Sequence, residues 1–335
     1  MFKYFFALIL VLSASSFAND SINAALSSDS ILLDITSLSA NQYVAVGERG
    51  HILIGSSVAD AQQVIVPTKA TLTAVTRIDN LLWAVGHDFT IIHSKDSGAT
   101  WQLQYQDVNK EHPLMDVHFF DQKHGIVAGA YGSFMRTVDG GKSWSTELHS
   151  TLLHPDDIEY LEEVREFDGE EFYKQELESI LPHFNRLYVF ENTVYMAGET
   201  GMLAQSTNQG MSWERIDIDY DGSFFDITSS KDILIAGGLR GNLFMKHSDN
   251  EWTRIDLCHT GSVNSLLIID ERLLVLSNNG YVATIDYLSV DDTPSCSDPQ
   301  VTIKQNSDKV TLLNALSLNN NMIAVTSNGL APLTE

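Results

Sequence analysis

The sequence predicts an all-β fold, a seven-bladed propeller whose blades are four-stranded sheets. Small-residue turns of the form G-x-x-G, or a close variant, begin at Gly47, Gly86, Gly129, Gly198, Gly238, Ser277 and Thr326. The spacings between these turns are 39, 43, 69, 40, 39 and 49 residues, so a period of about 40 residues is interrupted twice. Apolar residues around the turns alternate with a period of two, which indicates strands and excludes a helical repeat.

Each unit begins with an apolar stretch ahead of its turn, which we interpret as the innermost strand of a blade. These stretches cover residues 31–38, 71–78, 114–120, 184–190, 223–229, 262–269 and 312–318. Four short strands in about 40 residues are typical of a propeller blade. The last unit lacks an outer strand that carries Trp, and residues 22–26 precede the first unit unpaired. We expect these two ends to pair and close the ring.

Three octets link the third and fourth strands: SKDSGATW (94–101), TVDGGKSW (137–144) and STNQGMSW (206–213). In such an octet the Asp accepts backbone N–H groups, the Gly takes a positive φ and the Trp packs onto the next strand. This is the Asp box of propellers that resemble the bacterial neuraminidase repeats. We therefore predict structural roles for Asp96, Gly98, Trp101, Asp139, Gly141, Trp144, Asn208, Gly210 and Trp213.

Residues 1–18 have the layout of a secretory signal peptide. A single Lys is followed by an apolar run, and small residues stand at Ser16 and Ala18. We expect cleavage after Ala18, the alternative being an uncleaved anchor. The prediction is a periplasmic protein with one propeller domain over residues 19–335.

The net charge of −24 makes nucleic acid and anionic lipid poor partners for this surface. Cys258 and Cys296 are the two cysteines of the chain. In an oxidising compartment an even count permits one disulfide, the alternative being two free thiols.

Two insertions interrupt the repeat, at about residues 145–183 and 287–309. In the first, Pro155 and two acids form a first helical turn, apolar residues follow at helical spacing, and Gly169 separates a second helical stretch. This predicts a helical hairpin between blades 3 and 4, with twelve acids against two bases. Three roles are open for this hairpin: a passive, solvated surface insertion, an element that docks a partner, or a lid over a small-ligand pocket. We expect both insertions to follow an outer strand, and so to join the face that carries the G-x-x-G turns.

The sequence predicts no catalytic residue and no cofactor. A sialidase needs three converging Arg, a Tyr backed by Glu and an acidic Asp, whereas this chain has nine Arg in all and lacks the Arg-Ile-Pro triplet. The string DIDYDG (217–222) matches half of a calcium loop, but its twelfth position is Thr228. We therefore expect no metal site and keep Asp217, Asp219 and Asp221 as a weak calcium candidate.

A wider resemblance rests on VAVGERGHILIGS (44–56), WAVGHDFTIIHSKDSGATW (83–101), IVAGAYGSFMRTVDGGKSW (126–144) and YMAGETGMLAQSTNQGMSW (195–213). This order of strand, turn, strand and Asp box resembles the photosystem II stability and assembly factor family. The resemblance implies an exported, non-catalytic seven-bladed propeller that binds other proteins, often integral membrane proteins. Photosynthetic members use an Arg cluster, and here only Arg49 and Arg240 occupy comparable turn positions.

The predicted function is that of an assembly or accessory factor for a membrane-protein or envelope complex, and we expect a monomer. The alternative is a glycan-binding or sialidase-type propeller. The turns place one set of side chains around one mouth of the ring, and we predict that they bind the protein partner. They are Arg49, His87, Asp88, Tyr131, Glu199, Arg240 and Asn279.

Overall fold

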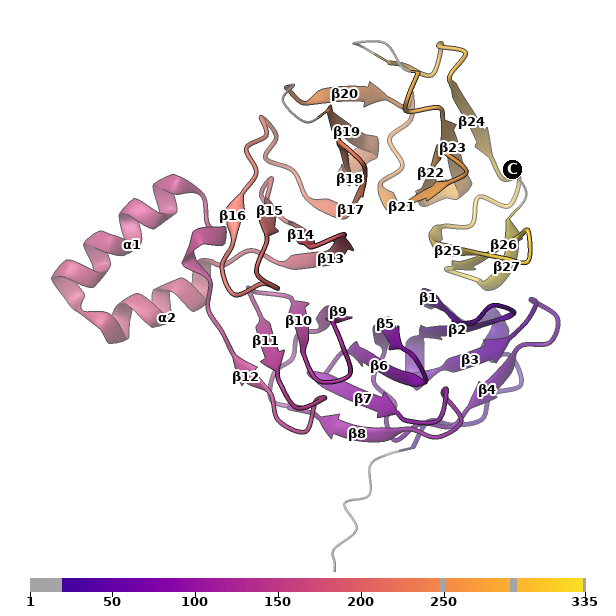
Figure 1. The fold of residues 1–335 in the computed structure, drawn as a ribbon, viewed down its shortest axis with the longest axis horizontal. Helices are drawn as coiled ribbons and strands as arrows, with labels where there is room; N and C mark the ends of the chain where they lie inside the picture. Colours follow the sequence, from indigo (N-terminus) through magenta and orange to yellow (C-terminus); the bar gives the residue numbers. More distant parts are fainter. Residues whose placement is uncertain (1–19, 248–250, 290–293, 334–335) are drawn as a thin grey trace, which may run out of the picture.

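The computed structural model describes residues 20–247, 251–289 and 294–333, so the predicted signal peptide lies outside the described residues. The strands form seven antiparallel sheets arranged radially about one centre (Figure 1). The prediction of an all-β, seven-bladed propeller is confirmed. Six blades have four strands, and the seventh has three within the described residues, where four were expected.

The first three blades follow one another without a long interruption. Blade 1 contains β1 (Leu32–Ser39), β2 (Gln42–Gly47), β3 (Ile52–Gly55) and β4 (Gln62–Val64). Blade 2 contains β5 (Leu72–Ile78), β6 (Leu81–Gly86), β7 (Thr90–Ser94) and β8 (Gln102–Tyr105). Blade 3 contains β9 (Leu114–Phe119), β10 (Gly125–Gly129), β11 (Phe134–Thr137) and β12 (Ser145–Thr146).

The remaining four blades follow two helices, α1 (Pro155–Asp168) and α2 (Glu170–Ile180). Blade 4 contains β13 (Phe184–Phe190), β14 (Thr193–Gly198), β15 (Leu203–Ser206) and β16 (Glu214–Arg215). Blade 5 contains β17 (Phe224–Ser230), β18 (Ile233–Gly238), β19 (Asn242–His247) and β20 (Thr253–Asp256). Blade 6 contains β21 (Val263–Ile269), β22 (Arg272–Ser277), β23 (Tyr281–Ile285) and β24 (Val301–Gln305), and blade 7 contains β25 (Leu312–Leu318), β26 (Asn321–Thr326) and β27 (Gly329–Leu333).

The G-x-x-G turns are tied to the start of the innermost strand of their own blade. The N–H of Glu48 donates to the carbonyl of Ile31 at 3.0 Å, and the equivalent bond recurs in the other six blades. A Cβ on Gly47 would lie 2.1 Å from that carbonyl oxygen, so a side chain there would break the contact. These bonds place all seven turns on one face, which we call the mouth.

The core consists of apolar clusters between neighbouring blades. One cluster joins blades 1 and 2 and includes Val44, Leu72 and Trp101. Another joins blades 7 and 1 through Leu32, Tyr43 and Val325. The sheets therefore pack face against face around the whole ring.

The ring does not close as expected, because residues 22–26 do not pair with blade 7. The N–H of Ser21 donates to the carbonyl of Val66, and the side chain of Gln63 bonds the N–H of Ala24 and the carbonyl of Ile22. These bonds hold the segment beside blade 1. The prediction of strand pairing was wrong, because this segment forms its hydrogen bonds with blade 1 and not with blade 7.

The predicted helical hairpin is present between blades 3 and 4 and projects outward from the ring (Figure 1). His154 caps α1, its Nδ1 accepting the N–H of Asp156, and Gly169 separates the helices at a φ of 91°. Leu161, Tyr173 and Leu177 are buried in the cluster that also contains Phe134 of blade 3 and Trp213 of blade 4. The base of the hairpin is therefore part of the core.

The second insertion does not follow an outer strand. Its first part, ahead of Val301, lies between β23 and β24, the third and fourth strands of blade 6, so it leaves the blade on the face opposite the mouth, and the stretch Val301–Gln305 is β24 itself. The expectation that both insertions join the mouth was wrong for this one. The outer strand Val301–Gln305 has the sequence VTIKQ, in which polar and apolar residues are mixed. The sequence therefore did not show that the fourth strand of blade 6 follows this loop.

The buried base of the hairpin predicts a large effect of truncation there. Leu177→Ala should lower the free energy of unfolding by about 2 to 4 kcal/mol, because it leaves a cavity between the hairpin and blades 3 and 4. Urea unfolding followed by circular dichroism measures the change. Glu178→Ala, at an exposed neighbouring position, is the control and should change stability little. Equal stability of the two variants would contradict this packing.

Candidate functional site: the central ring and the mouth

The innermost strands bring together one residue from each blade at the same register position. In every blade the pairing of the first two strands shifts just before this residue. The shifted register is a β-bulge, which leaves backbone N–H groups without partners in their own sheet. The seven residues, which we call the central ring, are Asp34, Ala74, Asp116, Arg186, Asp226, Ser265 and Asn314.

Three carboxylates of the central ring tie blades 1, 3 and 5 to the blade that follows each of them. Oδ2 of Asp34 accepts the N–H of Val75 at 2.8 Å. Oδ2 of Asp116 accepts the N–H of Leu187 at 2.8 Å, and Oδ2 of Asp226 accepts that of Leu266 at 2.7 Å. Blades 1 and 2, 3 and 4, and 5 and 6 are thereby joined at the centre.

The amide of Asn314 joins the two ends of the chain at the centre. Its Nδ2 donates to Oδ1 of Asp34 at 2.7 Å, and its Oδ1 accepts the hydroxyl of Ser265 at 2.9 Å. Blades 6, 7 and 1 are thus connected by buried side chains. The ring closes through these bonds and the apolar cluster of blades 7 and 1.

Arg186 is the cation of the central ring. Its Nε lies 3.2 Å from Oδ1 of Asp226 and 3.8 Å from Oδ2 of Asp116, and its Nη1 lies 4.0 Å from Oδ1 of Asp34. Burial disfavours its charge, but the three carboxylates outweigh burial and raise the pKa of Arg186 above its ordinary value. Burial also raises the pKa of Asp116 to about 6, although Arg186 opposes this.

A cavity of about 250 Å³ lies at the centre of the mouth. Its floor includes Arg186 and Asn314. The apolar residues of its wall are Leu33, Met115, Phe225 and Leu313, each one position nearer the mouth than a central-ring residue. We call these four the apolar rim.

The polar residues in the wall of this cavity are held by neighbouring blades. The hydroxyl of Thr73 donates to the carbonyl of Leu114 at 2.6 Å, and Nδ2 of Asn185 donates to that of Phe224 at 2.8 Å. The amide of Asn264 likewise donates to the carbonyl of Leu312 at 2.8 Å. A group bound in the cavity would therefore contact mainly the side chains of the apolar rim.

The turn residues predicted from the sequence lie on the same face as this cavity, one or two in each of six blades. Arg49, Tyr131, Arg240 and Asn279 occupy the left-handed position before a turn glycine, at φ of 52° to 59°. The side chain of Arg49 is 77% exposed and lies 3.9 Å from Glu48. His87 and Asp88 belong to the turn of blade 2, and Glu199 to that of blade 4.

One aromatic group forms among these turn residues. The ring of Tyr131 lies between those of His112 and His183, with centroids 5.3 and 4.4 Å away. Nδ1 of His183 lies 3.5 Å from Oε1 of Glu199. Tyr131 of blade 3 and Glu199 of blade 4 are therefore linked through His183.

Sequence reasoning missed the central ring and the apolar rim. A signal was present, because the seven innermost stretches align D, A, D, R, D, S and N at one position. Taken blade by blade, these letters suggest solvent-facing residues. Their common position becomes meaningful only once the strands are known to converge.

Comparison with known proteins supports the same architecture. A family model described as "Photosynthesis system II assembly factor YCF48" matches residues 102–186. The photosystem II assembly lipoprotein Ycf48 of Picosynechococcus sp. is 25% identical over 224 residues, which is 58% of this chain and 63% of that protein. The photosystem II assembly protein Ycf48 of Synechococcus sp. (strain JA-2-3B'a(2-13)) is 33% identical over 72 residues, 22% of each chain.

The chain is similar to the Ycf48 photosystem II assembly factors, in sequence over part of its length and in its propeller fold.

Two solved structures share this Ycf48-like fold. One, described as "YCF48 bound to D1 peptide", has a TM-score of 0.64 at 13% identity and covers 92% of this chain and 95% of its own. The other, YCF48 from Cyanidioschyzon merolae, has a TM-score of 0.62 at 12% identity and covers 90% and 95%. The aligned segments span less than two thirds of the length of the curated Ycf48 relatives.

The three octets form compact turns on the face opposite the mouth. Oδ1 of Asp96 accepts the N–H of Thr100 at 2.8 Å, and Nε1 of Trp101 donates to the carbonyl of Gly98 at 3.0 Å. Oδ1 of Asp139 and of Asn208 accept the matching N–H of Ser143 and Ser212 at 2.9 and 3.0 Å. The three glycines, Gly98, Gly141 and Gly210, have φ of 83°, 82° and 76°.

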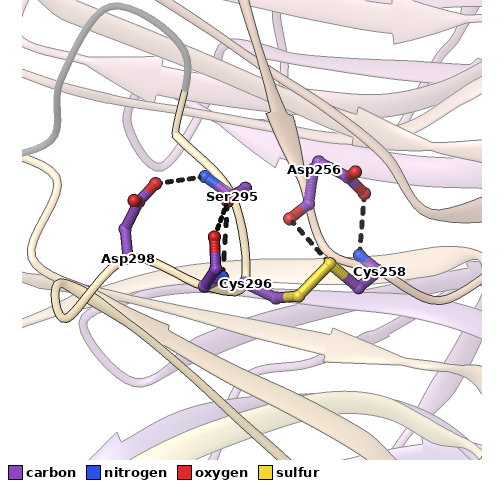
Figure 2. Close-up of a disulfide and its surroundings, with 6 residues drawn as sticks. Asp256, Cys258, Ser295, Cys296 and Asp298 are labelled. Atoms are coloured by element: carbon purple, nitrogen blue, oxygen red, sulfur yellow. Dashed lines mark hydrogen bonds between the residues drawn. A yellow bond between two sulfur atoms is a disulfide. The ribbon is translucent and has the colours of Figure 1, made fainter.

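Cys258 and Cys296 form a disulfide (Figure 2). The N–H of Asp256 donates to the carbonyl of Pro294 and that of Cys296 donates to the carbonyl of Asp256, both at 2.9 Å. The loop between β23 and β24 is thereby attached to the end of β20. This disulfide and these backbone bonds connect the outer edges of blades 5 and 6.

The weak calcium candidate does not assemble into a site. Among the residues that the structure describes, no three His, Cys, Asp or Glu side chains are grouped so that they could hold a metal ion. Asp217, Asp219 and Asp221 are exposed along the chain that leaves β16. Over the same described ranges, no helix is long and apolar enough to cross a membrane.

The octet geometry predicts graded effects of substitution at Asp139. Asp139→Ala should lower the urea midpoint of unfolding, because the bonds to the N–H and hydroxyl of Ser143 are lost. Asp139→Asn should lower it less, since Asn208 keeps the same N–H bond in the third octet. Partner binding should be unchanged in both folded variants. A midpoint for Asp139→Ala equal to that of wild type would refute this role.

The central ring predicts a pH dependence of stability. The folded pKa of Asp116, about 6, lies above the unfolded value of about 3.9. The folded state therefore holds this proton more tightly, so its contribution to stability is full below pH about 4 and is lost as pH rises through about 6. Asp116→Asn should flatten the stability curve over that window, measured by urea unfolding. Carboxyl NMR that showed Asp116 titrating near 4 would overturn the prediction.

Proposed function

We propose that this chain is an exported, non-catalytic accessory factor that binds a segment of a membrane-protein complex at the mouth of the propeller. The observation that carries the proposal is the cavity of about 250 Å³ whose accessible wall is the apolar rim. The carboxylates below it already accept backbone N–H groups from the next blade, which favours a binding role over chemistry at this point.

An apolar side chain of the partner fits this cavity, between Leu33, Met115, Phe225 and Leu313. Full burial of one such side chain contributes about 1.5 to 3 kcal/mol. The surrounding turns then supply polar contacts, with Arg49 and Arg240 as cations in an acidic field. This division into a central apolar anchor and a polar surround is typical of protein interfaces.

The similarity to Ycf48 supports this proposal, because the curated relatives are named as photosystem II assembly proteins and one similar propeller is described as bound to a D1 peptide. The predicted signal peptide and the disulfide both suit an oxidising, exported location such as the periplasm. We extend the comparison to a protein partner from an envelope complex and not to the photosystem itself.

The positions of the Trp residues favour protein binding over glycan binding. Glycan-binding and sialidase-type propellers would present aromatic platforms and carboxylates at the mouth. Here Trp101 and Trp213 are only 7% and 5% exposed and pack within apolar clusters between blades. The indole of Trp252 donates to the carbonyl of Asp217 on the outer wall.

The apolar rim gives a direct test of the mouth. Met115→Glu combined with Phe225→Glu should reduce cross-linked capture of partners from envelope extracts at least about fivefold. An apolar side chain of the partner would then have to bury the two new carboxylates, and removing a charge from water without a partner is costly. Met211→Glu, at a 67% exposed position in an octet on the opposite face, is the matched control and should capture as wild type does.

Circular dichroism and thermal melting check that each variant is folded. Arg49→Glu with Arg240→Glu should weaken capture more modestly, with an effect that shrinks as salt rises. Recovery of the same partners at equal levels by wild type, the rim variant and the Met211 control would contradict the proposed function.

A further inference from the structure

A groove runs down the outer wall of blade 4, beside the base of the hairpin. Two cavities, of about 330 and about 300 Å³, adjoin each other at His154 and Arg215, which line both. One end lies at Pro182 and Thr200, next to the turn residue Glu199 at the mouth. The other end lies at Trp252 of blade 5. We call this depression the hairpin groove.

Arg215 forms the centre of the hairpin groove. Its Nη1 donates to the carbonyl of Leu152 at 2.9 Å, which fixes the guanidinium against the hairpin base. Burial lowers the pKa of Arg215, and Asp217 and Asp157 oppose that effect from the two sides of the groove. A guanidinium carries five N–H donors. The bond to Leu152 uses one of them.

The walls of the hairpin groove are strongly acidic. Asp157 of α1 faces it from the hairpin, Asp217 and Asp219 from the chain after β16, Asp221 from the mouth end, and Glu251 from blade 5. Against these five carboxylates stand Arg215 and His154. All four Asp side chains are exposed, so they can pair with cations brought by a partner.

Each end of the hairpin groove also carries apolar surface. Ile180 and Pro182 line the end at the mouth, and Ile218 and Trp252 line the far end. The indole nitrogen of Trp252 is bonded to the carbonyl of Asp217 at 2.8 Å, so the ring is held in place. Apolar ends around an acidic centre match an extended segment in which apolar residues flank basic ones.

We propose that the hairpin groove binds an extended, basic segment of the protein partner. The segment's carbonyls accept from Arg215, its Lys or Arg side chains pair with Asp157, Asp217 and Asp221, and its apolar side chains contact Ile180 and Trp252. This inference rests on the proposed function, since the groove begins at the mouth where the partner is anchored. The same carboxylates repel nucleic acid and anionic lipid, which leaves a basic polypeptide as the occupant.

A defined peptide tests the groove without the natural partner. The probe is a fluorescein-labelled twelve-residue peptide built from Arg, Leu and Ser, and its counterpart has Glu in place of every Arg. Fluorescence anisotropy with the full exported chain should show binding of the basic peptide alone. Asp157→Arg with Asp221→Arg should weaken its Kd at least about tenfold, because two attractive charges become repulsive.

Glu163→Arg with Glu166→Arg is the matched control. It makes the same change in net charge at exposed positions on α1 that lie outside the walls of the groove. The control should change the Kd less than about threefold at 150 mM salt, where distant charges are screened. Thermal melting confirms that both double variants are folded.

Three results would overturn the inference: equal weakening by the two double variants, no weakening by the groove variant, or equal binding of the acidic peptide. The rim variant separates this test from that of the proposed function. If envelope capture depends on Met115 and Phe225 but the peptide does not need the groove, the groove inference fails and the proposed function stands. If the groove variant weakens peptide binding while the rim variant captures envelope partners as wild type does, the proposed function fails instead.

Discussion

The propeller depends on the way its seven innermost strands satisfy one another's backbone at the centre. A bulge at the start of every innermost strand leaves N–H groups that have no partner in their own sheet, and an unpaired buried N–H is costly. Asp34, Asp116 and Asp226 accept such groups from the following blade. The three carboxylates are themselves buried, and Arg186 offsets part of their charge. Neither the bulges nor the charges would be stable alone.

This central network explains how the ring closes without a shared strand. Blade 7 has three strands within the described residues, and the segment before blade 1 is attached to blade 1 itself. Asn314 nevertheless bonds Asp34 across the junction, and the apolar cluster of blades 7 and 1 covers that bond. Closure therefore rests on side chains at the centre and in the core. The disulfide Cys258–Cys296 joins two other blades at their outer edges and takes no part in it.

The same framework positions the proposed binding surfaces. Because each mouth-side turn is bonded to the start of its innermost strand, the turns and the apolar rim are fixed relative to the central ring. The hairpin is held by Leu161, Tyr173 and Leu177, so its acidic wall keeps a defined place beside Arg215. A rigid scaffold that presents loops and an insertion on one side is suited to recognising a protein segment at low entropic cost.

The sequence by itself determined the number of blades, the innermost strands, the mouth-side turns and the helical hairpin. Each depends on local physics: a period of two in apolar residues, the steric demand at positions such as Gly47, and the helix signals around Pro155 and Gly169. Only the tertiary structure decided where the second insertion leaves blade 6, which blade holds residues 22–26, and what Asp34, Asp116, Arg186 and Asp226 do. Those outcomes depend on contacts between residues tens to hundreds of positions apart, as in the bond between Asn314 and Asp34, so no local pattern encodes them. The apolar rim and the hairpin groove arise in the same way, because their walls come from different blades that meet only when the ring is closed.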